Sequence, residues 1–301
     1  MKKIISLIFL LISLTANAST TVPVVWPFSI GSMQANYLRV IIAEANKVQD
    51  KYNFVLENKP GAGGFIAATY VKNYNGVALM STTGAYFIRP FFYPNESHSV
   101  DDFKPVYIQC TQQPLLITSS KYKSFAELKS QERITVGAAL GTTSDVVARE
   151  LKASLPNVNV DIIPYNGGSL GALQDSIAGR IDLNIDFPAD LLQQIESGKL
   201  FPVGATGSID HKNMKTFNSQ GAPGFVGIAA NYTMYVKQDT DINVVKEMHE
   251  IFSKAATQAG SKLQDVYNKD FCLGSNYTLR ETNNLFAQWK VYWAEKLSKL
   301  K

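Results

Sequence analysis

The stretch from Arg133 to Asp186 reads RITVGAALGTTSDVVARELKASLPNVNVDIIPYNGGSLGALQDSIAGRIDLNID, and its hydrophobic pattern changes period repeatedly. Short apolar runs typical of buried strands alternate with segments whose apolar residues recur at helical spacing. The expected elements are strands over Arg133–Gly137, Val158–Ile163 and Ile181–Asp186, and helices over Ser144–Leu155 and Leu170–Ala178. Such alternation predicts α/β units with mostly parallel strands and right-handed crossovers.

The same alternation continues on both sides of this stretch. Further strands are expected over Thr21–Trp26, Asn53–Glu57, Gly76–Met80, Val106–Cys110 and Phe201–Ala205, and further helices over Gln34–Lys47, Phe65–Asn73, Asn243–Ala259 and Glu281–Leu300. Ligands of open α/β sheets bind in the crevice beyond the carboxyl ends of the strands. The loops that follow strands are therefore the places to look for a site: residues 27–34, 58–64, 81–90, 138–144, 164–169 and 186–190.

The first eighteen residues have the pattern of an export signal. Lys2 and Lys3 are followed by an apolar run from Ile4 to Leu14, and Ala16-Asn17-Ala18 is a small-residue cleavage site. The apolar run is too short for a membrane span, so we expect a secretory signal peptide that is cleaved after Ala18. The alternative is an N-terminal anchor that is retained after export.

Length and charge limit the classes of function. The formal net charge is +4, and removing residues 1–18 takes away two lysines and no acid. A balance this small gives no reason to expect nucleic acid or an anionic membrane as a partner. Residues 19–301 exceed what one ordinary core needs, so two domains are expected.

The cysteines and histidines do not indicate a metal site. Cys110 and Cys272 either form a disulfide in an oxidising compartment or remain two separate buried thiols, and the sequence leaves both open. His98, His211 and His249 are scattered without the spacing of metal ligands. We therefore expect neither a metal nor a cofactor.

Two strand–loop–helix joints are rich in small and hydroxyl residues. They are Pro27–Ser32 and Ala138–Asp145, and each is expected to place backbone N–H groups and hydroxyls at a helix N-terminus. The helix dipole adds about half a positive charge there, so such a joint can bind a carboxylate or phosphate without Lys or Arg. The alternative is plain N-capping, in which the Ser and Thr side chains serve their own helix.

The best enzymatic interpretation rests on Gly167–Gly171, which matches the G-x-S-x-G pattern of serine hydrolases. Ser169 would be the nucleophile, and Asp186 or Asp190 and then His211 follow in hydrolase order. Pro164-Tyr165-Asn166 stand between the strand and this motif, so the tight turn that the nucleophile needs is not expected. An exported serine hydrolase is therefore the second hypothesis.

Several short blocks together resemble the signature of the tripartite tricarboxylate transporter receptor family, the TctC/Bug type. Their order and spacing hold from about residue 22 to 298, and the combination is specific although each block alone is weak. The blocks are Glu57–Gly64, Asp102–Val106, Pro164–Gly168, Leu173–Asp175, Gly179–Leu183 and Gly198–Leu200.

The resemblance implies a two-lobed, periplasmic-binding-protein-like fold of type II, with a ligand cleft between the lobes. One lobe would comprise residues 19–115 and 230–301 and the other 116–229, with crossovers near Pro114–Thr118 and Gly227–Tyr235. It further implies a monomeric periplasmic receptor that is not an enzyme. Such a receptor captures a small organic carboxylate and delivers it to integral membrane permease subunits.

By the same resemblance, two loops and three strand ends would hold the ligand through backbone amides, hydroxyls and water. Asp186 would repel a second carboxylate, which favours a ligand with a donor group, such as an amino or hydroxy acid. The ligand-binding residues expected on this basis are Phe28, Ser29, Ile30, Gly31, Ser32, Thr83, Ala139, Gly141, Thr142, Thr143, Tyr165 and Asp186.

The first loop departs from the family pattern. The usual Gly-Gly is Gly31-Ser32 here, the usual acid three residues later is Ala35, and the usual Asp-Gly before the third strand is Asn75-Gly76. These departures leave the identity of the ligand and of the cognate permease open.

Overall fold

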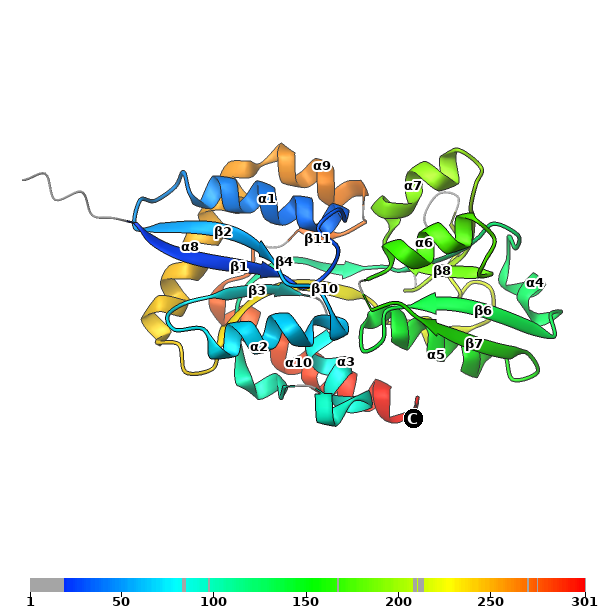
Figure 1. Cartoon of the computed structure of the whole chain (residues 1–301). Helices are drawn as coiled ribbons and strands as arrows, with labels where there is room; N and C mark the ends of the chain where they lie inside the picture. The colour runs from blue at the N-terminus through cyan, green and yellow to red at the C-terminus, as the bar shows by residue number, and fades with distance from the viewer. Residues whose placement is uncertain are drawn as a thin grey trace, which may run out of the picture.

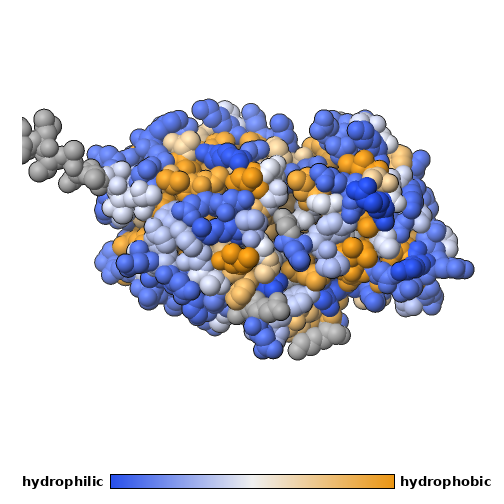
Figure 2. All heavy atoms as spheres, viewed as in Figure 1, coloured by the Kyte–Doolittle hydropathy of each residue, from blue (hydrophilic) through white to orange (hydrophobic). Residues whose placement is uncertain are grey.

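The strands of the computed structural model form two sheets, each at the centre of one lobe (Figure 1). The structure describes residues 19–82, 85–96, 98–166, 168–207, 210, 214–269, 271–274 and 276–300. The predicted signal peptide, residues 1–18, lies outside these ranges. The two-lobed α/β architecture expected from the sequence is confirmed, and hydrophilic residues cover most of the outer edge of both lobes (Figure 2).

Lobe 1 is built on a six-stranded sheet in the order β11-β4-β10-β3-β1-β2. Strands β1, β2 and β3 are parallel, whereas β10 runs antiparallel to both β3 and β4. The strands are β1 Thr20–Trp26, β2 Tyr52–Asn58, β3 Leu79–Thr82, β4 Phe103–Gln113, β10 Ala230–Lys237 and β11 Leu273–Gly274.

Lobe 2 is built on a five-stranded sheet in the order β7-β6-β8-β5-β9. Strand β6 is parallel to β7 and β8, and β5 runs antiparallel to β8 and β9. The strands are β5 Leu116–Ser119, β6 Arg133–Ala138, β7 Asn159–Pro164, β8 Leu183–Asp186 and β9 Phe201–Ala205.

Helices cover both faces of each sheet, so the central strands β1, β3, β8 and β10 are buried over most of their length. Adjacent residues of β1 point to opposite faces, so Val24 and Val25 are both fully buried but belong to different core clusters. The helices are α1 Met33–Ala45, α2 Phe65–Asn73, α3 Ala85–Phe92, α4 Phe125–Lys129, α5 Thr143–Ser154, α6 Leu170–Ile177, α7 Pro188–Glu196, α8 Ile242–Ala259, α9 Ser261–Lys269 and α10 Leu279–Ser298. Short 3-10 turns lie at Ala62–Gly64, Pro94–Glu96, Val100–Asp102 and Pro223–Phe225.

The chain passes from lobe 1 to lobe 2 between β4 and β5 and returns before β10 (Figure 1). A third connection is made by α10, whose last turns reach the core of lobe 2. Trp293 and Leu297 are buried there, and Lys296 Nζ lies 2.8 Å from Glu150 Oε2 on α5. The lobe boundaries expected from the sequence stay a prediction, and α10 contributes to both cores.

Local patterns located most elements to within a few residues. The expected helix over Glu281–Leu300 is α10, and its start at Thr278 carries a capping box with Glu281. Helices α3, α7 and α9 were not expected. Their segments are short and lack a long run of periodic apolar residues, so periodicity gave no signal for them.

The two cysteines, whose pairing the sequence left open, form a disulfide. The bond joins Cys110 on β4 to Cys272, next to β11, with the Cα atoms 5.8 Å apart. Both residues are buried in the lobe 1 core. The bond therefore ties the segment after α9 to β4, the second strand of the sheet.

We expect the double substitution Cys110→Ser and Cys272→Ser to lower the free energy of unfolding by about 2–4 kcal/mol, because the bond closes a long loop in the unfolded chain. Urea unfolding of the mature chain measures this difference. A reductant should destabilise the wild type by a similar amount and leave the double variant unchanged. Equal stability of oxidised wild type and variant would contradict the expectation.

Candidate functional site

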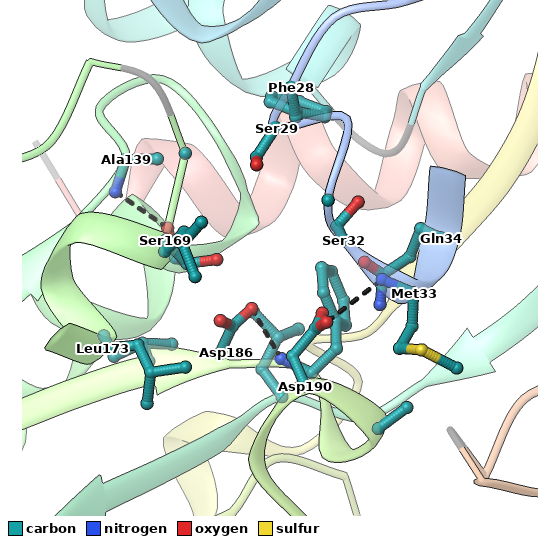
Figure 3. A pocket seen from close by; sticks show the side chains of 18 of the residues that line it. Phe28, Ser29, Ser32, Met33, Gln34, Ala139, Ser169, Leu173, Asp186 and Asp190 are labelled. Atoms are coloured by element: carbon teal, nitrogen blue, oxygen red, sulfur yellow. Dashed lines mark hydrogen bonds between the residues drawn. The ribbon is translucent and has the colours of Figure 1, made fainter. Parts of the chain in front are cut away.

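A cavity of about 350 Å³ lies between the two lobes (Figure 3). We call it the interlobe cavity. Its walls come from the loop after β1 and the start of α1 in lobe 1, and from the loops after β6, β7 and β8 in lobe 2. It is lined by Trp26, Phe28, Ser29, Gly31, Ser32, Met33, Gln34, Leu115, Ala139, Thr142, Thr143, Ser144, Gly168, Ser169, Leu170, Leu173, Ile185, Asp186, Phe187, Ala189, Asp190, Gln193, Gln194 and Tyr232.

The two joints singled out in the sequence meet at this cavity. They lie in different lobes, and the strand ends bring them to opposite sides of one space. The expected site residues that line it are Phe28, Ser29, Gly31, Ser32, Ala139, Thr142, Thr143 and Asp186.

Three expected site residues lie outside the cavity lining, each for a local reason. Ile30 is 38% exposed, and its carbonyl accepts a bond from Arg39. The Gly141 N–H donates to Asp145 Oδ2 at 2.8 Å. Tyr165 donates its hydroxyl to Asp175 Oδ2 at 2.5 Å, and its ring packs where Gly137 and Gly171 leave room. Thr83 lies outside the described residues.

Many of the hydroxyls and amides of the two joints serve their own helices. Ser32 Oγ accepts the Ala35 N–H at 3.4 Å, and Thr142 Oγ1 accepts the Ser144 N–H at 3.3 Å. Ala139 N–H donates to Ser144 Oγ at 3.0 Å. The N-capping alternative therefore describes these groups correctly, although the joints also line a common cavity.

Thr143 behaves differently from its neighbours. It is the first residue of α5 and is only 2% exposed, yet its hydroxyl has no hydrogen-bond partner among the described residues. A buried hydroxyl without a partner costs about 1–3 kcal/mol. Thr143 also lines the interlobe cavity, so this unpartnered hydroxyl belongs to a residue of the cavity wall.

Two acids, Asp186 and Asp190, lie on one wall of the cavity between Ser169 on one side and Met33 on the other (Figure 3). Asp186 ends β8 and accepts the Phe187 N–H at 2.9 Å and the Ser169 hydroxyl. Asp190, in the first turn of α7, accepts the Met33 N–H of lobe 1 at 3.0 Å.

Burial is the main cause of the raised pKa of both acids. It raises the pKa of Asp186 well above the ordinary value, and the charge of Asp190 adds to this effect. Burial also raises the pKa of Asp190, against the opposing hydrogen bonds from the Met33 N–H and the Gln34 side chain. The two acids also raise the pKa of Tyr232, although burial is the larger cause.

No Lys, Arg or His is found among the described residues that line the interlobe cavity. Aromatic rings form part of its wall instead. Tyr232 lies between Trp26 and Phe187, with ring centroids 6.0 Å and 5.8 Å away. Across the part of the chain that the structure describes, no cluster of His, Cys, Asp or Glu could hold a metal ion, and no helix is long and apolar enough to cross a membrane.

Sequence reasoning treated Asp190 only as a member of a hydrolase triad and did not single out Gln34, Phe187 or Tyr232. Asp190 follows Asp186 by four residues and ends the loop 186–190, which was a candidate site because it follows a strand. This spacing was the signal in the sequence that could have identified Asp190. Tyr232 could not be found in this way, because it comes from β10, far from the loops in sequence.

The geometry around Ser169 differs from that of a hydrolase nucleophile. Ser169 precedes α6 in an ordinary right-handed helical conformation, and its hydroxyl contacts Asp186 rather than a histidine. A strained turn that exposes the hydroxyl is the usual device in G-x-S-x-G enzymes. His211, the third member of the hypothetical triad, lies outside the described residues.

We expect the ligand-free protein to lose stability through Asp186 as the pH rises. Because the pKa of Asp186 is raised in the folded protein, its carboxyl group binds a proton more tightly there than in the unfolded chain. The stabilising contribution is therefore complete below about pH 4 and is lost as the pH rises through the raised pKa. Asp186→Asn should remove this slope and should stabilise the ligand-free protein at pH 7 by about 1–3 kcal/mol. Thermal unfolding between pH 4 and 8 measures both effects.

Asp161→Asn is the matched control, because Asp161 pairs with Arg133 at the surface of the same lobe. Its effect should stay within about 1 kcal/mol at every pH. If the stability of Asp186→Asn depends on pH as strongly as that of the wild type, Asp186 is not the cause of the pH dependence.

Known proteins resemble this chain in sequence and in fold. A UPF0065 protein of the tcbD-tcbE intergenic region of Pseudomonas sp. (strain P51) is 26% identical over 77% of this chain and 73% of its own length. The periplasmic binding protein BugD has the same fold, with a TM-score of 0.82 and 23% identity over 93% of this chain and 97% of that chain. MatC from Rhodopseudomonas palustris, solved with bound malate, has a TM-score of 0.79 and 22% identity over 92% and 98%.

The likeness in fold to BugD and MatC confirms the expected periplasmic-binding-protein architecture. The model of the tripartite tricarboxylate transporter family receptor matches residues 38–272, which include the loops after β6, β7 and β8 that line the interlobe cavity. With its two α/β lobes and a cavity between them, the chain belongs to this family of receptors.

Proposed function

We propose that this protein captures a small organic carboxylate in the interlobe cavity and delivers it to the integral membrane subunits of a tripartite tricarboxylate-type transporter. The observation that carries the proposal is the meeting of both ligand loops, from different lobes, at one cavity. Membership of the receptor family supports the class of ligand and the transport role. MatC, which shares the fold, has been solved with bound malate.

The working place that follows from this role is the periplasm. The signal-like pattern of residues 1–18 agrees with export, and cleavage after Ala18 would leave a mature chain from Ser19. A pair of buried cysteines joined in a disulfide is also typical of an oxidising compartment. We infer that the mature receptor works there as a monomer, without a metal or a cofactor.

Capture requires the lobes to separate and close again. Contacts that bridge the cleft beside the cavity include the Met33 N–H and the Gln34 side chain, which both donate to Asp190. Opening the cleft breaks these contacts to Asp190. A hinge motion about the crossovers would allow this opening, as in other two-lobed binding proteins.

The ligand carboxylate is expected at the N-terminus of α5. The dipole of this helix favours an anion at that end, and the Thr143 hydroxyl there has no partner among the described residues. Charge-assisted hydrogen bonds are worth about 1.5–3 kcal/mol each, so a few of them are consistent with micromolar binding after the cost of closure.

We expect at least one small carboxylate in a panel of mono-, di- and tricarboxylates, with amino acids among the monocarboxylates, to raise the melting temperature of the refolded, ligand-free mature chain. A ligand at 100 times its dissociation constant stabilises the protein by about 2.7 kcal/mol, which corresponds to a shift of several degrees. Thr143→Val should weaken binding by about 10-fold or more through the lost hydrogen bond. Differential scanning fluorimetry followed by isothermal titration calorimetry makes both measurements.

Thr118→Val is the matched control. Thr118 in β5 is likewise buried, and its hydroxyl finds no partner within the described part of the chain, but Thr118 does not line the cavity. The affinity of Thr118→Val should equal that of the wild type. Absence of any shift across the panel would overturn the proposed function, and equal losses in both variants would remove Thr143 from the site.

We infer that the protein does not catalyse a reaction at Ser169. Turnover of short p-nitrophenyl esters by the mature chain should therefore equal that of Ser169→Ala and stay at the level of the buffer. The Ser169→Ala variant should instead change ligand affinity, because Ser169 lines the cavity. Ester turnover that disappears in the variant would favour the hydrolase hypothesis.

A further inference from the structure

The N-terminus of α1 already holds a carboxylate that belongs to the protein. Met33 is the first residue of α1, and its N–H has no partner within the helix. Asp190 reaches this N–H from lobe 2 and accepts it at 3.0 Å, and the Gln34 side chain also donates to Asp190. A ligand carboxylate at this end of the cavity would face the charge of Asp190.

Another part of the cavity lining is suited to an anion. Helix α5 is twelve residues long and begins at the cavity, and the hydroxyl of its first residue, Thr143, is buried with no partner among the described residues. The acid in its first turn, Asp145, is paired with Arg149 at 2.9 Å. No acidic side chain other than Asp186 and Asp190 is among the described residues of the lining. The cavity therefore has an end that favours a carboxylate and a wall that disfavours one.

The described residues of the wall with Asp186 and Asp190 include no positively charged side chain. The cavity lining supplies no cationic side chain among the described residues, and Asp186 is only 4% exposed. Two nearby buried acids without a cation are costly when both are ionised. A cationic group on the ligand would remove that cost, and it would do so only in the bound state.

We propose that the ligand of the interlobe cavity carries an ammonium group as well as its carboxylate, and that Asp186 and Asp190 bind the ammonium group. This inference rests on the proposed function and narrows it from carboxylates in general to small amino acids. Dicarboxylates and tricarboxylates that lack an amine are disfavoured, because their second carboxylate would meet the two acids.

The aromatic wall and the size of the cavity agree with such a ligand. Trp26, Phe28, Phe187 and Tyr232 line the space next to the acids, and ring faces attract cations. A volume of about 350 Å³ lies near the lower limit for a small-molecule pocket. The ligand is therefore a single compact molecule.

The test compares ligands that differ in one group, by isothermal titration calorimetry on the mature chain. The panel contains the common L-amino acids and 4-aminobutyrate, each against an analogue without the amine, such as L-alanine against L-lactate and 4-aminobutyrate against succinate. The tightest amino acid should bind at least about 10-fold more tightly than its analogue. Asp190→Asn should reduce this ratio by about 10-fold, because one of the two charges is lost.

Asp190→Asn keeps a side-chain oxygen for the Met33 N–H, so the contact between the lobes can persist. Asp161→Asn, at the surface of lobe 2, is the control and should leave the ratio unchanged. Equal or tighter binding of the amine-free analogues, or an unchanged ratio in Asp190→Asn, would overturn this inference while the proposed function stands. Absence of binding by every carboxylate would overturn both.

Discussion

Two buried carboxyl groups share one wall of the interlobe cavity with no cation among its described lining residues, and this constraint governs the behaviour of the site. The protein accommodates them through hydrogen bonds. Asp186 is served by its own lobe, through Ser169 and the Phe187 N–H, whereas Asp190 is served by Met33 and Gln34 of the other lobe. The interaction that stabilises Asp190 therefore also holds the lobes together, so the ionisation of this acid and the closure of the cleft are linked.

The connections between the lobes determine how the cleft can open and close. Each lobe has its own sheet with helices on both faces, and the lobes are joined at the β4–β5 crossover and the return to β10. Helix α10 adds a third tie, because its last turns and the Lys296–Glu150 pair belong to the lobe 2 core. Two lobes joined through these segments can move about them, and a ligand that contacts both lobes would favour the closed cleft.

The sequence predicted the features that depend on neighbours along the chain. Strand–helix alternation over residues 133–186 is a local pattern, and so are the caps at Ser32 and Thr142, which the structure contains. The family resemblance implied that Tyr165 would line the ligand cleft, but Tyr165 donates its hydroxyl to Asp175 on the next helix. The contact between Asp190 and Met33 spans 157 residues, so no pattern in the chain could indicate it.

The pairing of Cys110 with Cys272 shows the same limit. The sequence allowed a disulfide or two separate thiols, and the register of β4 beside β11 decides between them. The family resemblance reached further than local patterns, because it fixed the two-lobed fold and the loops that meet. The resemblance did not indicate Asp190, the second acid of the cavity wall, because this acid depends on the identity of one residue at the start of α7.

A crystal structure of the mature chain with the tightest amino acid of the panel tests the central claim most directly. The account predicts one ligand in the interlobe cavity, with its carboxylate within hydrogen-bond distance of the Thr143 hydroxyl and its ammonium group between Asp186 and Asp190. A ligand bound outside this cavity, or one whose carboxylate points at the two acids, would contradict it.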